Sequence, residues 1–553
     1  MTARTTPDAA RLLVDCLVEQ GTDRIFTVPG ESFLQVLDAL HGRSEIELVT
    51  CRQEGGVTFM ACADGTMTGR PGIAFVTRGP GATNASIGVH VAHQDSQPMI
   101  LFVGDVDRSM REREGFQEID FPAFFGPICK WAARIDSADR IPEFVARAFA
   151  TAISGRPGPV VLALPEDMLN DATSARPRPY VSRPPQAMCP DAMQALMGLL
   201  ADAASPVAII GGAGWNHKAL VYFQQFAERI GLPVATAFRR QDAISPDSPV
   251  YAGNLGYGPN PRLVERVKQA DLVIAVGARL GEATTDGYTF PAPDREDQLL
   301  VHIHPDPEEL NRVYQTDLAI CCAMDEFAEA AALWDDASIL SFEAGAQAHA
   351  EWEAWATPAP APFALDLGQC VAFMRETFPA DTIICNGAGN FSGWWHRYWR
   401  YAGFPSQLAP TSGAMGYGVP AAVAAARRFP ERTVVALAGD GDFLMNGQEL
   451  ATAVQHGCNM IVLVIDNGAY GTIRMHQERE FPARVSGTEL ANPDFAALGA
   501  AFGAWSQRVD TTDQFKAALA TAQGLKGVRL LHCVIEVEQL AASGATVSGL
   551  RKR

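Results

Sequence analysis

Residues 433–471 read TVVALAGDGDFLMNGQELATAVQHGCNMIVLVIDNGAYG, and this stretch is the clearest indication of the fold class in the sequence. TVVALAG is a short apolar run of strand type that ends at the GDG turn around Asp440, and MIVLVID is a second such run that ends before Asn467. Between them, Asn446 followed three residues later by Glu449 predicts a capped helix. The stretch therefore predicts a βαβ unit.

Polar side chains follow both strands at the point where each strand ends. If the strands are parallel neighbours, Asp440 and Asn467 meet at their carboxyl ends, where open α/β sheets bind ligands. A carboxylate, an amide oxygen and a free backbone carbonyl form an oxygen-only set that suits Mg²⁺, which also takes substrate phosphates. The unit is thus predicted to hold a metal-bound diphosphate. The alternative is an Asp-Gly turn in an ordinary α/β domain.

Composition narrows the class of protein. A chain of 553 residues with 48% hydrophobic residues is long enough for several domains with buried cores. The net charge of −19 argues against a nucleic-acid partner, and no apolar run reaches the length of a membrane span. The N-terminal stretch alternates charge with Leu and Val, unlike a signal peptide. Eleven cysteines without CxxC pairs fit reduced thiols, so we expect a cytoplasmic enzyme.

Repeated strand–turn–helix units divide the chain into three α/β segments separated by Pro-rich linkers. We expect an N-terminal domain over 1–175, a central domain over 190–335 and a C-terminal domain over 360–545. GIAFVTRGPGATN at 72–84 and TVVALAGDGDFLMN at 433–446 both run from strand to Gly-rich turn to Asn. This internal echo supports two similarly wound domains on either side of a different middle one.

The GDG turn followed after a second strand by Asn resembles the thiamine diphosphate motif. RGPGATN at 78–84, FQE at 116–118 and VGAR at 276–279 fall in the order found in the acetolactate synthase large-subunit-like family. The resemblance covers nearly the whole chain. It implies an α/β fold of three consecutive parallel-sheet domains: a pyrimidine-binding domain, a central Rossmann-like domain and a diphosphate-binding domain.

Thiamine diphosphate and Mg²⁺ are the cofactors that this resemblance implies. The implied metal ligands are Asp440, Asn467 and the carbonyl of Ala469, and Asp466 departs from the first of the two Asn residues usual in the family. The other implied cofactor contacts, on the diphosphate side and around the wedge Met415 that bends the cofactor, are Asn390, Phe391, Gly413, Met415, Gly439, Gly441, Asp442 and Tyr470.

The segment VTCRQEGGVTFM contains Glu54, which matches the family's Glu that acts on the cofactor's aminopyrimidine. Its small and apolar neighbours are expected to bury it, and a carboxyl that shares its proton readily suits this step. Gln53 replaces the family's usual His. In this family the Glu of one chain faces the metal motif of another, so the resemblance implies a homodimer or homotetramer with active sites between subunits.

The implied reaction is decarboxylation of a 2-oxo acid with transfer of the activated aldehyde to a second carbonyl, as in an acetolactate synthase-like carboligase. Two positions favour ligation. Gln117 lies where decarboxylases carry paired His, and Ile473 lies where they place a second Glu. Glu31 in VPGES lies where pyruvate decarboxylases carry Asp, so it favours the alternative of a non-ligating decarboxylase or C–C lyase. A helix N-terminus also explains Glu31. A non-catalytic cofactor-binding relative is a further alternative.

The central segment is a candidate FAD site, because Arg279 in VGAR matches a flavin-contacting position of the family. GGAGW is only a partial dinucleotide fingerprint, and LGEATTDGY departs from the family pattern. His302 and His304 share one face of the strand LLVHIHPDP but lack a third metal ligand, so we expect them to be structural.

Overall fold

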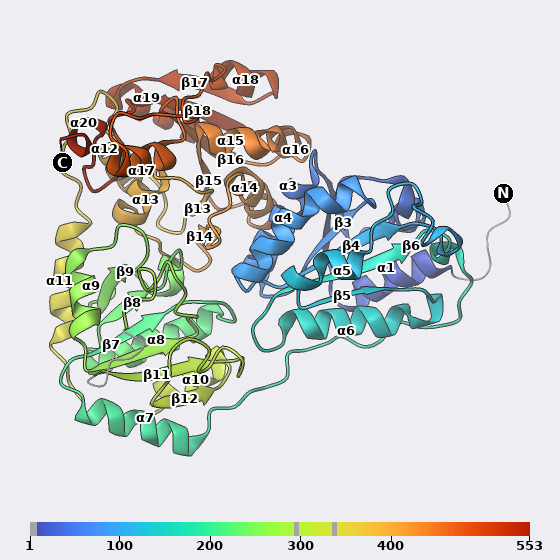
Figure 1. Cartoon of the computed structure of the whole chain (residues 1–553), viewed down its shortest axis with the longest axis horizontal. Coiled ribbons are helices and arrows are strands. Elements are labelled where there is room, and N and C mark those ends of the chain that lie inside the picture. The colour runs from blue at the N-terminus through green and yellow to red at the C-terminus, as the bar shows by residue number, and fades with distance from the viewer. Residues whose placement is uncertain (1–7, 292–297, 335–339, 553) are drawn as a thin grey trace. The chain divides into compact units, whose positions relative to one another are not determined.

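The computed structural model describes residues 8–291, 298–334 and 340–552, so the first seven residues of the N-terminal stretch lie outside it. Within these ranges the chain forms three six-stranded sheets (Figure 1), in which all the strand pairings are parallel. Helices accompany the strands of each sheet. This architecture confirms the predicted α/β class with three consecutive parallel-sheet domains.

The first sheet has the order β2-β1-β3-β4-β6-β5. Its strands are β1 (Arg24–Thr27), β2 (Glu47–Thr50), β3 (Gly72–Val76), β4 (Met99–Asp105), β5 (Trp131–Arg134) and β6 (Pro159–Pro165). The helices between them are α1 (Ala9–Glu19), α2 (Leu34–Leu40), α3 (Glu54–Thr68), α4 (Pro80–Gln94), α5 (Phe121–Phe125) and α6 (Ile141–Ile153). The run GIAFV, which opens the first half of the internal echo, forms β3.

The C-terminal sheet has the order β14-β13-β15-β16-β18-β17. Its strands are β13 (Ile383–Asn386), β14 (Gln407–Leu408), β15 (Val434–Gly439), β16 (Met460–Asp466), β17 (Trp505–Val509) and β18 (Val528–Val534). Its helices are α12 (Leu367–Thr377), α13 (Ser392–Tyr398), α14 (Gly418–Arg428), α15 (Asp440–Asn446), α16 (Leu450–Gln455), α17 (Gly471–Glu480), α18 (Phe495–Ala501), α19 (Thr512–Gln523) and α20 (Val547–Leu550). Numbered from its first strand, this sheet repeats the order of the first sheet, and β3 and β15, the strands of the internal echo, take equivalent places.

The central sheet is wound differently, in the order β12-β11-β10-β7-β8-β9. Its strands are β7 (Pro206–Ile210), β8 (Val234–Thr236), β9 (Tyr251–Asn254), β10 (Leu272–Val276), β11 (Leu299–His304) and β12 (Leu318–Cys321). Its helices are α7 (Pro190–Asp202), α8 (His217–Ile230), α9 (Pro261–Gln269), α10 (Met324–Ala332) and α11 (Ala344–Trp355). Renumbered within the domain and read from the β9 edge, this is the Rossmann order 3-2-1-4-5-6.

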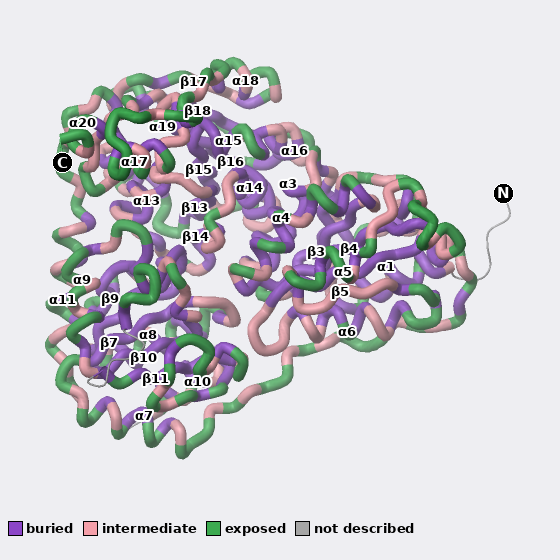
Figure 2. The backbone as a smooth tube through the Cα atoms, in the orientation of Figure 1, coloured by how far each residue is buried: buried purple, intermediate pink, exposed green. Residues whose placement is uncertain are grey.

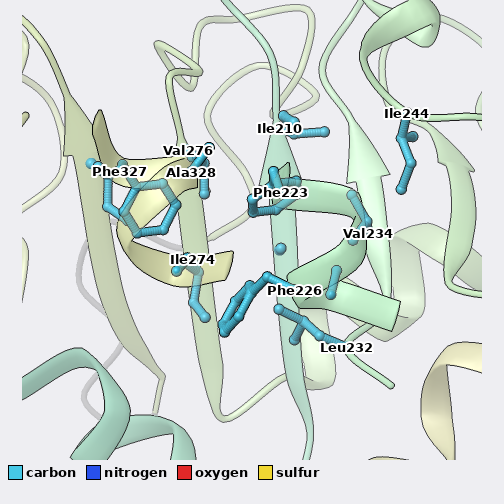
Figure 3. Close-up of a cluster of buried hydrophobic side chains, with 14 of the residues drawn as sticks. Ile210, Phe223, Phe226, Leu232, Val234, Ile244, Ile274, Val276, Phe327 and Ala328 are labelled. Atoms are coloured by element: carbon cyan, nitrogen blue, oxygen red, sulfur yellow. The ribbon is translucent and has the colours of Figure 1, made fainter. Parts of the chain in front are cut away.

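Burial explains why the inner strands read as unbroken apolar runs. A parallel sheet covered by helices on both faces buries both sides of its strands. Strands such as β7, β10 and β15 are accordingly buried along their whole length (Figure 2). In the central domain, Phe223 and Phe226 of α8 pack in one cluster with Ile210 and Ile274 of the sheet (Figure 3).

The helical part of the βαβ unit differs from the expected capped helix. Helix α15 begins at Asp440, directly after β15, and a 3₁₀ turn, η8 (Gly447–Glu449), separates it from α16. The side chain of Asn446 makes no capping hydrogen bond at the start of η8. The carboxylate of Glu449 cannot complete a capping box, because it accepts hydrogen bonds from the backbone of the first domain instead.

The chain separates into two compact units. One consists of residues 1–184, 423–428 and 446–458, and the other of residues 185–422, 429–445 and 459–553. Within the first unit, Arg428 at the end of α14 forms ion pairs with Asp23 at 2.6 Å and with Asp64 at 2.8 Å. We retain the domain boundaries predicted from the sequence as a proposal. No helix in the described ranges is long and apolar enough to cross a membrane.

Candidate active site

The two halves of the diphosphate motif lie at the carboxyl ends of neighbouring strands. β15 and β16 pair in parallel, with Gly439 opposite Ile465, so Asp440 and Asn467 both follow the ends of adjacent strands. The backbone N–H of Ala469 donates to Asp440 Oδ2 and to Asn467 Oδ1, each at 3.1 Å. One backbone group therefore joins all three residues that the sequence assigned to the metal.

A cavity of about 240 Å³ opens beside these residues. Apart from Glu54, every residue that the resemblance assigned to the cofactor or its metal lines it: Asn390, Phe391, Gly413, Met415, Gly439, Asp440, Gly441, Asp442, Asn467, Ala469 and Tyr470. Ile473 lines it as well. Sequence reasoning missed several lining residues, among them Trp394, Thr472, Ile535, Gln539 and Leu540, because they lie outside any motif.

The donor set and the glycines of this cavity suit a metal-bound diphosphate. A carboxylate, an amide oxygen and a backbone carbonyl are the hard oxygen ligands that Mg²⁺ prefers. A Cβ on Gly441 would lie 2.5 Å from the Tyr470 ring, and one on Gly439 would lie 2.9 Å from the Phe391 ring. Glycine at these positions therefore lets the backbone come close to the two rings that line the cavity. The residues present fit thiamine diphosphate with Mg²⁺.

Asp466, the departure from the family motif, has its own partners. His532 on β18 donates from Nε2 to Asp466 Oδ2 at 2.8 Å, and the N–H of Gly468 donates to Oδ1 at 3.0 Å. Burial by itself would raise the pKa of Asp466, but these hydrogen bonds outweigh it and hold that pKa below its usual value. Burial raises the pKa of the neighbouring Asp440, and the negative charge of Asp466 adds to this effect.

Asp442 holds two loops of the cavity together. Its Oδ1 accepts from the N–H of Gly416 at 2.7 Å and from the N–H of Ala388 at 3.3 Å. It thereby ties the turn after β13 to the loop that carries Met415. Burial raises the pKa of Asp442 to about 7, although these N–H groups oppose the shift. A Cβ on Gly387 would lie 2.0 Å from Asp442 Oδ1, so only glycine fits there.

Glu54 is the first residue of α3 in the first unit. Gln53, which replaces the family's His, caps this helix: its Oε1 accepts from the N–H of Gly55 at 2.6 Å and from that of Gly56 at 3.1 Å. Asn84 donates to Glu54 Oε2 at 2.9 Å. The Glu54 side chain is half-buried rather than enclosed, because the small residues that follow it in α3 are turned into the core while Glu54 stands at the helix start.

A buried carboxylate that sequence analysis assigned to capping supports this helix start. Glu449 is fully buried and accepts from the N–H of Arg52 at 3.1 Å and from the N–H of Gln53 at 2.9 Å. Burial raises the pKa of Glu449, and its hydrogen bonds act in the opposite direction. A Cβ on Gly56 would lie 2.6 Å from Glu449 Oε1, so the carboxylate leaves room only for glycine at this position.

The turn after β3 gathers the other candidates of the first unit. Ser32, next to Glu31, has its hydroxyl 2.9 Å from that of Thr77. A Cβ on Gly81 would lie 3.5 Å from Glu54 Oε1, and one on Gly79 would lie 2.6 Å from the Gln117 Cβ. Gln117 itself has a positive φ of 64°. Glu31, Glu54 and Gln117 thus all lie near residues of the 77–81 turn.

The central domain carries the residues that the sequence made a candidate FAD site. At the point where its strand order reverses, a Cβ on Gly212 would lie 1.9 Å from the Gly277 carbonyl oxygen, so the turns after β7 and β10 approach each other closely. Arg279 lies 3.4 Å from Glu309 in an ion pair. FAD binding in this domain stays a prediction. His302 and His304 are buried with backbone partners, as expected of structural residues.

Models of known protein families match a segment in each of the three domains. The family model described as thiamine pyrophosphate enzyme, N-terminal TPP binding domain, matches residues 7–124, the central-domain model matches 193–331, and the C-terminal TPP binding domain model matches 387–533. Fold and matches together define a thiamine diphosphate-dependent enzyme.

Curated relatives narrow this class. The acetolactate synthase isozyme 2 large subunit of Escherichia coli (strain K12) is 30% identical over 96% of this chain and 96% of its own length. The acetolactate synthase large subunit of Parasynechococcus marenigrum (strain WH8102) is 31% identical over 94% of this chain and 86% of its own length. The acetolactate synthase of Bacillus subtilis (strain 168) is 28% identical over 95% and 93%. The chain belongs to the acetolactate synthase-like family of thiamine pyrophosphate enzymes.

Proposed function

We propose that the chain decarboxylates a 2-oxo acid and transfers the resulting aldehyde unit to a second carbonyl compound, using thiamine diphosphate and Mg²⁺. The observation that carries this proposal is the oxygen donor set at the cavity, in which the Ala469 N–H joins Asp440 and Asn467. The names of the three relatives described above, all acetolactate synthases, support ligation over simple decarboxylation.

Thiamine diphosphate, when bound, supplies the carbon nucleophile and the electron sink of this reaction. The chain would hold Mg²⁺ and the diphosphate through Asp440, Asn467 and the Ala469 carbonyl. Glu54 would exchange a proton with the aminopyrimidine. Because Asn84 occupies Glu54 Oε2, we assign this exchange to Oε1. Buried apolar wall residues such as Trp394 and Ile535 would keep water from the reacting carbon.

Glu54 and the cavity belong to different compact units, and we propose that the working enzyme is a homodimer or homotetramer in which the two come from different subunits. Light scattering coupled to size-exclusion chromatography should give a mass of two or four chains. A monomer with full activity would contradict this assembly.

Product analysis tests the reaction directly. We expect purified protein incubated with thiamine diphosphate, Mg²⁺ and pyruvate to give acetolactate or acetoin in proton NMR spectra. Acetaldehyde as the sole product would show that the chain decarboxylates its substrate without ligation, which is the alternative that the exposed Glu31 favours. The variant Glu54→Gln serves as the control, because it keeps the shape of the side chain but cannot exchange a proton in the same way. Full turnover by this variant would remove Glu54 from the mechanism.

A further inference from the structure

Asn492 connects the candidate metal ligand Asp440 to the neighbouring carboxylate of Asp466. Its side-chain nitrogen donates to Asp440 Oδ2 and to Asp466 Oδ1, each at 2.8 Å. An amide NH₂ group has two hydrogens, so each carboxylate receives one. Asn492 lies on the segment between α17 and α18, and the backbone pairing of Leu490 N–H with the Gly468 carbonyl at 2.8 Å holds that segment beside the motif.

The far side of Asp466 is fixed by His532. Because an ionised carboxylate only accepts hydrogen bonds, His532 donates from Nε2 to Asp466 Oδ2, at 2.8 Å. His532 lies on β18 with 1% of its surface exposed, and its ring packs edge-on against Phe495 with the ring centres 5.1 Å apart. A rigid core residue therefore orients Asp466, and Asp466 in turn orients the amide of Asn492.

The remaining contacts of Asp440 complete its orientation. Oδ1 accepts from the N–H of Gly441 at 2.9 Å, and Oδ2 accepts from the N–H of Ala469 at 3.1 Å as well as from Asn492. Asn492 is the only side chain among these donors. Without it, only two backbone N–H groups in the described part of the chain would donate to the Asp440 carboxylate and oppose its rotation.

We propose that Asn492, held by Asp466 and His532, is a positioning residue that orients the Asp440 carboxylate for Mg²⁺. This rests on the proposed metal site. Asp466 offers acceptors to Asn492, Gly468 and His532 at once, whereas the family's Asn would present an NH₂ group toward His532, which would then have to accept through Nε2. Residues that orient a metal ligand affect metal affinity by about 10–100-fold.

Metal binding by the full chain tests the proposal without relying on turnover. Mn²⁺ serves as the probe, because its free ion gives an EPR signal that falls on binding, and the titration is run with thiamine diphosphate present. We expect Asn492→Leu and Asn492→Ala to raise the Kd for Mn²⁺ about tenfold or more. His532→Phe should raise it in the same direction, and His532→Gln, which keeps a donor, should recover most of the affinity. Asn170→Ala, at an exposed position of the first compact unit, is the control and should leave the Kd unchanged.

Asp440→Ala distinguishes failure of the proposed metal site from failure of the proposed role of Asn492. If Asp440→Ala abolishes Mn²⁺ binding but both Asn492 variants, folded by circular dichroism, bind as tightly as the unmodified chain, the role of Asn492 is overturned and the metal site stands. If Asp440→Ala binds Mn²⁺ normally, the proposed metal site fails and the role of Asn492 fails with it.

Discussion

The buried carboxylate of Glu449 accepts a hydrogen bond from the backbone N–H of Gln53 at 2.9 Å, across 396 residues of sequence. Gln53 is the N-cap of the helix that begins at Glu54. Glu449 also accepts from the N–H of Arg52, and the hydroxyl of Thr452 donates to its other oxygen at 2.5 Å. The backbone that presents Glu54 is therefore held from outside its own sheet.

Replacing Glu449 by Ala should weaken both the fold and the reaction. The N–H groups of Arg52 and Gln53 would lose their acceptor in a partly buried place, at a cost of about 1–3 kcal/mol. We expect a lower melting temperature and, because Glu54 is no longer held, a fall in kcat of about tenfold or more. Thermal unfolding and steady-state kinetics measure the two effects.

Glu449→Gln is the matched variant, since its amide keeps the shape and one acceptor oxygen. It should recover part of the loss in both measurements. If Glu449→Ala had the same melting temperature and the same kcat as the unmodified chain, Glu449 would have no part in positioning Glu54.

Patterns local in sequence predicted the fold well, and long-range contacts explain most of what they missed. The buried strands β15 and β16 read as apolar runs, whereas β17 is half-exposed and mixed in polarity, and β14 has two residues. No local pattern distinguishes such edge strands from loops. The role of Glu449 was missed for a related reason, because its partners lie in another domain of the sequence.

In the candidate site, too, residues in local motifs could be predicted and residues that act through long-range contacts could not. Asp440 and Asn467 could be predicted because ligands bind at the carboxyl ends of the strands in parallel sheets. Asn492 and His532 could not, since neither belongs to a motif and each is identified only by the side chain that it meets. The one signal available was Asp466, whose departure from the family pattern indicates that its partners differ as well.

Asp442 should matter through its hydrogen bonds rather than its charge. Asp442→Ala removes the acceptor for the N–H groups of Ala388 and Gly416, and so frees the loop that carries Met415. We expect affinity for thiamine diphosphate, measured by calorimetry with Mg²⁺ present, to fall about tenfold, which corresponds to about 1.4 kcal/mol.

Asp442→Asn provides the control. The Oδ1 atom of the Asn can still accept from both N–H groups. The substitution also removes the buried negative charge of Asp442, whose Oδ2 has no hydrogen-bond partner in the described part of the chain. This variant should bind the cofactor normally and melt at the same or a higher temperature. A loss of affinity equal to that of Asp442→Ala would show that the charge itself is required.

His396 should make the protein less stable in mild acid. Burial, followed by the charge of Arg239, lowers the pKa of His396 to about 3, below the unfolded value of 6.5. A histidine with a lowered pKa contributes its stability above pH 6.5 and loses it as the pH falls toward 3, because the unfolded chain takes up the proton first. At a pH of about 5.5 the loss is about 1.4 kcal/mol.

Melting temperatures at pH values of about 8 and 5.5 measure this effect. His396→Gln should reduce the difference between the two, and His41→Gln, at an exposed position, should not. Part of the difference should remain, because burial also lowers the pKa of His302 and of His304. An undiminished difference in His396→Gln would contradict the assignment.

Ile473 should influence which acceptor the enzyme accepts. It lies in the first turn of α17, lines the cavity and is 53% exposed. Ile473→Glu would add a negative charge where a second 2-oxo acid, itself an anion, has to approach, whereas a released aldehyde is neutral. Repulsion of about 1 kcal/mol would lower the ratio of acetolactate, the product of addition to a second 2-oxo acid, to acetaldehyde about fivefold. Proton NMR of the products measures this ratio. Ile473→Gln adds polarity without charge and should change it much less; equal ratios in all three proteins would exclude Ile473 from acceptor selection.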